Sequence, residues 1–236
     1  MPSSLISLAW WSALAALAAA LGPVLAEPRR WLPFSPLGWA SALAAGMMLG
    51  VAYPLMVVGV ERAAPMAAMG AIIGVAVPYL AHVVIGVGRG QEPTTDSGIT
   101  LTGAVHGSAE GIAMGAAMTL GAPLGLFLVA TLAIHNIWES AVLADRVESK
   151  GRSRARAAVL GVMTNVPQAL MAVASHAALL RWPSALPVLL GVAFGALVYL
   201  CFAELLPDSY GREGRTGIAL VVSVAAGVVA VMAGRV

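Results

Sequence analysis

The sequence predicts an all-α membrane protein with eight transmembrane helices. Of its 236 residues, 60% are hydrophobic and only 10% are charged, a balance that excludes an ordinary soluble domain. The apolar residues form runs of about 20 residues, which is the length that a helix needs to cross a hydrocarbon core of about 30 Å. The runs span residues 5–26, 37–60, 66–88, 98–120, 123–145, 157–180, 184–206 and 216–234.

These runs leave no stretch for a separate soluble domain, so residues 1–236 are predicted to form a single polytopic transmembrane domain. The first run has no Lys or Arg before its long apolar core, which favours a retained helix over a signal peptide. A net charge of +2 is too small to indicate nucleic acid as a partner. The one cysteine, Cys201, permits neither an intrachain disulfide nor a thiolate cluster.

The basic residues divide unequally between the two sets of loops that eight spans create. Cytoplasmic loops carry an excess of Lys and Arg, so the richer side is predicted to be cytoplasmic and both termini extracytoplasmic. The poorer side has Arg62, Arg181 and Arg235. The richer side has Arg29, Arg30, Arg89, Arg146, Lys150, Arg152, Arg154, Arg156, Arg212 and Arg215.

Two pairs of ionisable residues lie in the fourth and fifth runs. His106 and Glu110 form one pair, and His135 and Glu139 form the other. Each pair has i, i+4 spacing, so both side chains project from one face of a helix. The break at residues 121–123 predicts a tight turn between two antiparallel helices. The pairs lie about 13 and about 15 residues from that turn, a difference of about 3 Å in depth, which places them level near the membrane midplane.

A divalent cation would explain four ionisable side chains at one depth. Each lone charge in hydrocarbon costs at least about 2.5 kcal/mol, and two neutral imidazoles with two carboxylates carry a total charge of about −2, which a divalent cation neutralises. Nitrogen and carboxylate ligands suit zinc, iron, cobalt and manganese. The alternative is hydrogen bonding between helices, which would suffice for one histidine but is disfavoured by two matched pairs.

The motifs around these pairs resemble those of a known family. His-Gly-Ser-Ala-Glu-Gly at 106–111 and His-Asn-Ile-Trp-Glu-Ser at 135–140 resemble the metal-binding motifs on the fourth and fifth helices of the ZIP family (zinc- and iron-regulated transporter-like proteins). Ala-Gly-Met-Met-Leu at 45–49 resembles its second helix. Gly-Ala-Leu-Val-Tyr at 195–199, followed by Glu-Leu-Leu-Pro at 204–207, resembles its seventh. The resemblance implies metal uptake into the cytoplasm across the cell (plasma or inner) membrane. It also implies that Glu204 binds the ion transiently on the cytoplasmic side of the centre.

Three amides are further candidate ligands. Asn165 and Gln168 flank Pro167, about 15 Å along the sixth run from its cytoplasmic start and therefore near the depth of the pairs. They either complete the coordination shell or satisfy the carbonyl that a proline kink frees, and the sequence leaves both interpretations open. Asn136 directly follows His135 and is the third candidate.

The sequence also predicts a single metal ion per chain. ZIP proteins with two adjacent metal sites commonly have Asn after the histidine of the fourth helix and a carboxylate before the proline of the sixth. This chain has Gly107 and Val166 at those positions. Two divalent ions would then share only Glu110 and Glu139, and their repulsion in a low-dielectric site would be poorly neutralised.

Glycines in the fourth run recur every four residues, which predicts a neighbouring helix packed closely along them: Gly103, Gly107, Gly111 and Gly115. Three further polar residues are interpreted as having no part in the metal site. Asp208 is interpreted as a solvated loop residue, His82 as a packed or interfacial residue, and His176 as interfacial.

The predicted function is transport of a divalent transition-metal cation into the cytoplasm by alternating access. Zinc is the first candidate; iron, manganese, cobalt and cadmium use similar ligands. The metal is the cargo, no cofactor is expected, and the protein is predicted not to be an enzyme. The alternatives are an intramembrane zinc-dependent hydrolase, which needs an open coordination position and a separate base, and a bis-histidine haem carrier, which two buried glutamates disfavour. The metal, the energy source and the oligomeric state, a homodimer included, stay open.

Overall fold

The computed structural model describes residues 2–26, 36–86 and 95–236, and the regular structure in these ranges is entirely helical. The prediction of an all-α protein is therefore confirmed for the described residues. The helices are α1 (Pro2–Ala18), α2 (Gly22–Leu25), α3 (Pro36–Ile85), α4 (Asp96–Leu120), α5 (Ala122–Glu148), α6 (Arg154–Arg181), α7 (Leu186–Leu200), α8 (Leu206–Arg212) and α9 (Arg215–Ala233), with 3-10 turns at Ala19–Leu21 and Pro183–Ala185 and a π-helical turn at Cys201–Leu205.

Six helical stretches of the described chain are long and apolar enough to cross a membrane: Leu5–Leu25, Leu37–Ile85, Ala122–Glu148, Arg154–Arg181, Pro183–Arg212 and Arg215–Ala233. The prediction of eight spans is thus met in part. The predicted span 37–60 and the described part of the predicted span 66–88 both belong to α3, which ends at Ile85. The predicted span 98–120 lies on α4, which has 25 residues but is not among the six because polar residues and glycines lower its hydropathy.

Helix α3 reverses its direction at Ala63. A straight helix of 50 residues would be about 75 Å long, more than twice the thickness of a hydrocarbon core. Ala63 has non-helical backbone angles (φ −164°, ψ 87°). A Cβ atom added to Gly59 would lie 3.3 Å from the Cβ of Ala67, although eight residues of straight helix span about 12 Å. The two halves of α3 are therefore antiparallel and correspond to two of the predicted spans.

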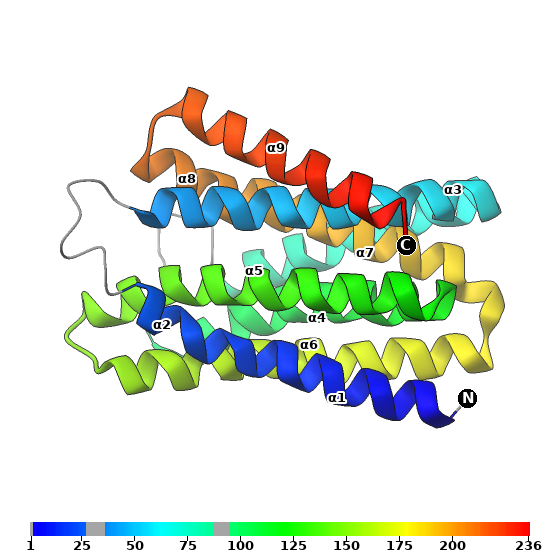
Figure 1. Cartoon of the computed structure of the whole chain (residues 1–236), viewed down its shortest axis with the longest axis horizontal. Coiled ribbons are helices and arrows are strands. Elements are labelled where there is room, and N and C mark those ends of the chain that lie inside the picture. The colour runs from blue at the N-terminus through cyan, green and yellow to red at the C-terminus, as the bar shows by residue number, and fades with distance from the viewer. Residues whose placement is uncertain (1, 27–35, 87–94) are drawn as a thin grey trace.

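The helices pack in two layers (Figure 1). Helices α1, α2, α4, α5 and α6 form one layer, and α3, α7, α8 and α9 form the other. Helices α4 and α5 contact α3 and α7 across the boundary. The largest cluster of buried apolar side chains joins the layers and includes Met48, Leu55, Leu128, Leu190 and Leu197. Burial of this apolar surface stabilises the association of the layers.

The row of glycines on α4 faces α6, as the spacing predicted. A Cβ atom at Gly111 would overlap the carbonyl oxygen of Gln168, and one at Gly115 would overlap Ser175 Oγ. The backbones of the two helices therefore approach closely. The other glycines with this spacing also lie at helix contacts, namely Gly46 and Gly50 against α9, and Gly70 and Gly74 of α3 against α7, whose Gly191 and Gly195 face α3 in return.

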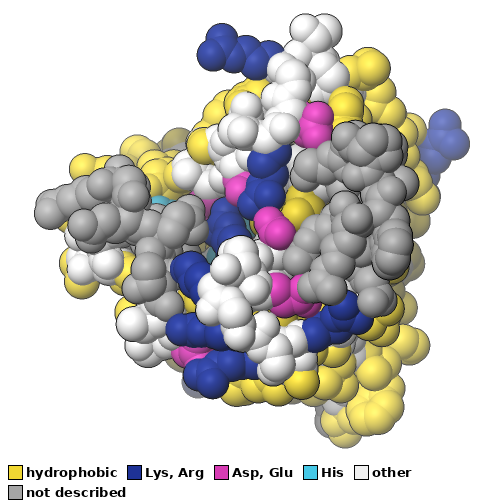
Figure 2. All heavy atoms as spheres, turned by 90° about the vertical axis from the view of Figure 1, so that its left-hand side faces the viewer, with side chains coloured by type: hydrophobic (Ala, Val, Ile, Leu, Met, Phe, Trp, Pro, Cys, Tyr) yellow, Lys and Arg dark blue, Asp and Glu magenta, His cyan; other side chains and the backbone are white. Residues whose placement is uncertain are grey.

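Both termini lie toward the same end of the molecule, on the right in Figure 1. At the opposite end, basic and acidic side chains gather (Figure 2) and form ion pairs between helices. Arg156 of α6 and Arg152, just before α6, both contact Asp96 of α4. Arg212 lies 3.0 Å from Asp145, joining α8 to α5 across the boundary between the layers. Of the basic residues predicted for this side, Arg29, Arg30 and Arg89 lie outside the described residues.

Asp208 is not a solvated loop residue, so that interpretation was wrong. The helical chain continues through the π-helical turn into α8, and Asp208 lies in the first turn of α8. Its side chain is only 13% exposed. It accepts hydrogen bonds from Ser41 at 2.6 Å and Arg146 at 2.9 Å. Asp208 therefore links α3, α5 and α8.

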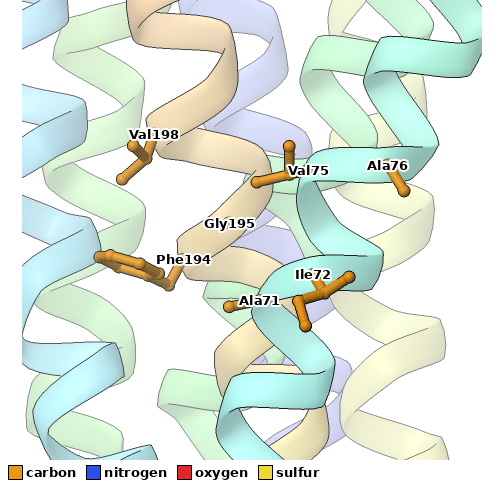
Figure 3. Close-up of a pocket in the computed structure, with 7 residues that line it drawn as sticks. All are labelled: Ala71, Ile72, Val75, Ala76, Phe194, Gly195 and Val198. Carbon is orange, nitrogen blue, oxygen red and sulfur yellow. The ribbon is translucent and has the colours of Figure 1, made fainter.

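An apolar groove lies between the second half of α3 and α7 (Figure 3). It is lined by Ala71, Ile72, Val75, Ala76, Phe194, Gly195 and Val198. Ile72 is 71% exposed, as expected for a side chain that faces lipid. These side chains carry only carbon, so the groove offers no side-chain ligand for a cation.

Candidate metal centre

The turn between α4 and α5 brings the two predicted pairs to the same depth. Gly121 adopts an extended conformation between the helices (φ 166°, ψ 148°), and Pro123 lies in the first turn of α5, where its missing N–H costs no hydrogen bond. The rings of His106 and His135 stack with their centroids 5.7 Å apart. The expectation that the pairs are level is therefore met.

The four predicted ligands converge on one small volume. His135 Nε2 lies 3.1 Å from Glu110 Oε1 and 3.7 Å from Glu139 Oε2. His106 Nε2 lies 3.8 Å from Glu110 Oε1, and His106 Nδ1 lies 3.7 Å from Glu139 Oε1. One nitrogen of each histidine and one oxygen of Glu139 lie within 4.8 Å of one another. This set of donors could hold a metal ion.

These side chains are largely buried, so placing their ionisable groups together costs free energy unless they share a cation. Glu110 and His135 are fully buried, and His106 is 1% exposed; the side chain of Glu139 is 29% exposed. Three facing atoms, Nε2 of both histidines and Oε1 of Glu110, have no hydrogen-bond partner among the described residues. Buried polar atoms are normally paired, so an unpaired group of this kind indicates a site for a bound ligand.

Nδ1 of each histidine also lies near an acceptor outside the four predicted ligands. His135 Nδ1 donates to the backbone carbonyl of Ala44 at 3.2 Å. His106 Nδ1 lies 3.4 Å from Glu204 Oε2. The backbone carbonyl of Ala44 can only accept, so it fixes the His135 tautomer in which Nε2 keeps its lone pair. Such partners are typical of histidines that bind metals.

Glu204 lies beside the cluster and has a second partner that the sequence did not reveal. Its Oε1 lies 2.8 Å from Nε2 of His82, although neither atom has a partner with hydrogen-bond geometry among the described residues. Tyr199 Oη lies 3.2 Å from His82 Nδ1. His82 is packed, as one of the two interpretations from the sequence had it, and it also lies against Glu204; its depth in the third run, near the level of Glu204, was the signal that the sequence offered.

The three candidate amides lie in different surroundings. Gln168 Nε2 donates to Glu110 Oε2 at 2.8 Å. Asn136 Nδ2 donates to Gln168 Oε1 at 2.8 Å and to the carbonyl of Ala15 at 3.0 Å. Asn165 Nδ2 instead donates to the carbonyl of Gly161 in its own helix. Gln168 and Asn136 thus join the cluster as hydrogen-bond partners, and the role of all three as metal ligands stays a prediction.

His176 lies between α4 and α6, away from the cluster. It is 3% exposed and therefore packed between helices, and its interfacial depth stays a prediction. Its Nδ1 lies 2.8 Å from Thr119 Oγ1. This contact links the two helices near the end of α4.

Several apolar helices and a buried His/Glu cluster define a multi-pass membrane protein with a candidate cation centre. No protein family model matches the chain. The chain is similar to an Arabidopsis thaliana protein named "Putative zinc transporter", with 28% identity over 113 residues. The match covers 48% of this chain and 18% of the plant protein, so the chain spans less than a fifth of that relative.

Proposed function

We propose that the chain transports a divalent transition-metal cation, zinc first, into the cytoplasm. The observation that carries this proposal is the convergence of two histidines and two glutamates, fully or largely buried, on one volume between α4 and α5. A divalent cation neutralises the two carboxylates, which no neutral ligand would do. The resemblance to ZIP proteins and the name of the plant relative both support a metal, and zinc in particular.

The proposed topology has eight membrane crossings and both termini outside. The reversal of α3 at Ala63 provides two crossings in place of one, and the length of α4 is sufficient for another. An even number of crossings agrees with termini at the same end (Figure 1). The ion-paired arginines lie at the opposite end (Figure 2), which the positive-inside rule assigns to the cytoplasm.

The two layers offer a simple basis for alternating access. His106, Glu110, His135 and Glu139 belong to α4 and α5 in one layer, whereas Glu204 belongs to the other. Movement of one layer against the other would therefore change which side chains and which water the ion meets. An ion leaving the four ligands would next meet Glu204 and, beside it, His82.

A zinc-dependent hydrolase remains the second candidate, and the geometry favours it less. Hydrolysis requires a water-activating base in addition to the ligands. Here each glutamate of the cluster faces a histidine of the cluster, and Glu204 lies between His106 and His82. None of the three is positioned apart from the candidate ligands to serve as that base.

The decisive experiment is uptake into proteoliposomes that contain the purified protein. We expect accumulation of radioactive or fluorescently detected zinc above that in empty liposomes, with a panel of other divalent ions defining selectivity. Runs with and without a proton gradient would define the energy source. An absence of uptake for every divalent ion tested, by correctly inserted protein, would refute transport.

Metal binding is expected to weaken as pH falls from about 8 to about 5. An imidazole must be neutral to bind a metal, so protons compete with the ion for His106 and His135. The measurement is a zinc-binding titration at several pH values with the purified protein. An affinity that does not change across this range would contradict coordination by the histidines.

A further inference from the structure

A chain of buried amides connects the candidate metal centre to α1. It begins at the carbonyl of Ala15, which accepts from Asn136 Nδ2 at 3.0 Å. Asn136 Nδ2 also donates to Gln168 Oε1 at 2.8 Å, and Gln168 Nε2 donates to Glu110 Oε2 at 2.8 Å. Asn136, Gln168 and Glu110 are all 0% exposed. The chain therefore joins α1, α5, α6 and α4 without access to bulk water.

The direction of every bond in this chain is fixed by its two ends. A backbone carbonyl and a carboxylate only accept hydrogen bonds, so an amide nitrogen must face each end. Asn136 must direct Nδ2 at Ala15, and Gln168 must direct Nε2 at Glu110. Flipping the amide of Gln168 would bring its oxygen against the carboxylate oxygen of Glu110, with no hydrogen atom between them.

In this arrangement the two oxygens of Glu110 have different surroundings, and only Oε1 faces the histidines. Oε2 of Glu110 accepts the hydrogen bond from Gln168. Oε1 faces Nε2 of His135 at 3.1 Å and Nε2 of His106 at 3.8 Å. A carboxylate commonly bridges two metal ions by offering one oxygen to each. Gln168 holds Oε2, the oxygen that a second ion would use, in a hydrogen bond.

Charge connects the same position to the number of ions. The carboxylates at the centre are Glu110, Glu139 and Glu204, which together carry about −3 when ionised. One divalent ion leaves a net charge of about −1 and two leave about +1, whereas a further carboxylate at position 168 would bring the total to about −4 and neutralise two ions. The same substitution would remove the blocking N–H group.

We infer that Gln168 is a positioning residue that limits the centre to one divalent ion by holding Oε2 of Glu110 in a hydrogen bond. The inference rests on the proposed function, because it assumes that the centre binds a metal. It also assigns Gln168 a role different from direct coordination. If Gln168 were a direct ligand, the Gln168→Glu variant would still bind one ion. If Gln168 blocks Oε2 of Glu110, the same variant should bind two.

The test is the number of zinc ions bound by the purified full-length protein and its variants. We expect wild type to bind one equivalent of zinc and Gln168→Glu to bind two, measured by equilibrium dialysis and elemental analysis. X-ray absorption of the loaded Gln168→Glu variant should show a metal–metal distance of about 3.5–4 Å, absent from wild type. One equivalent in the Gln168→Glu variant, or two in wild type, would overturn the inference.

Val159→Glu is the charge control. It adds a carboxylate to the same helix, nine residues earlier, at a side chain that is 60% exposed and is not a candidate ligand. We expect this variant to bind one equivalent. Two equivalents would show that any added carboxylate on α6 recruits zinc, and would overturn the inference.

Gln168→Leu tests the positioning role independently of added charge. It removes the donor, so Glu110 loses its fixed direction, and partners of this kind typically contribute 10–100-fold in metal affinity. We expect zinc affinity about 10–100-fold weaker with one equivalent still bound, in protein that remains monodisperse and helical. Unchanged affinity would overturn the inference. If wild type itself bound no zinc, the proposed function would fail as well, and that result differs from every outcome above.

Discussion

We expect the replacement of Glu110 and Glu139 together with alanine to abolish metal uptake. The double variant leaves two histidines to hold a divalent ion with no compensating carboxylate between α4 and α5. Each uncompensated charge in the membrane costs at least about 2.5 kcal/mol, so two cost about 5 kcal/mol or more. That corresponds to a loss of affinity of more than about a thousandfold. The measurement is zinc uptake into proteoliposomes, with the folded state checked by circular dichroism.

Glu61→Ala is the control for this variant, because Glu61 is an exposed glutamate close to the reversal of α3 at Ala63. It should leave uptake unchanged. His135→Ala should reduce zinc affinity less than the loss of either carboxylate, since it removes a ligand but leaves the charge balance intact. Normal uptake by the correctly inserted double variant would refute the site. A histidine variant that is affected as severely as a glutamate variant would argue against charge neutralisation as the main contribution.

Local sequence spacing predicted the centre of the site well. His106 and Glu110, and likewise His135 and Glu139, share helix faces because of their i, i+4 spacing. The distance of each pair from one tight turn then predicts their relative depth. Both arguments depend only on the geometry of a helical hairpin, so they needed no knowledge of the other helices. The stacking of the two histidines is their structural consequence.

Contacts between distant helices could not be predicted in this way. His82 meets Glu204 because the glycine contacts between α3 and α7 set the register of those helices. Asp208 is buried because the chain continues as a helix through a π-helical turn, which hydropathy does not reveal. The hydrogen bond from Gln168 to Glu110 likewise depends on how α6 packs against α4. The sequence identified these polar residues, but their partners depend on helix packing.

The close contact between α4 and α6 leads to the second prediction with a large expected effect, a substitution of Gly111. A Cβ atom at this position would overlap the carbonyl oxygen of Gln168 and lie 2.9 Å from the backbone nitrogen of Ala172. Backbone atoms cannot move aside as a flexible side chain can, so Gly111→Leu must push α4 away from α6. Overpacking typically costs about 1–3 kcal/mol, and a leucine pressed against backbone should lie at or above the upper end of that range.

Gly111→Leu should therefore lower the Tm of the purified protein by about 6–12 °C, since each kcal/mol shifts Tm by about 2–4 °C at this chain length. It should also weaken zinc binding, because Glu110 is the neighbouring residue and its hydrogen bond to Gln168 crosses the same helix contact. Gly227→Leu in α9 is the matched control, because a Cβ atom there has no neighbour within 4 Å, and its Tm should change by about 2 °C or less. Equal shifts in Tm for the two variants would contradict the close approach of α4 to α6 and, with it, the geometry that directs Gln168 at the metal centre.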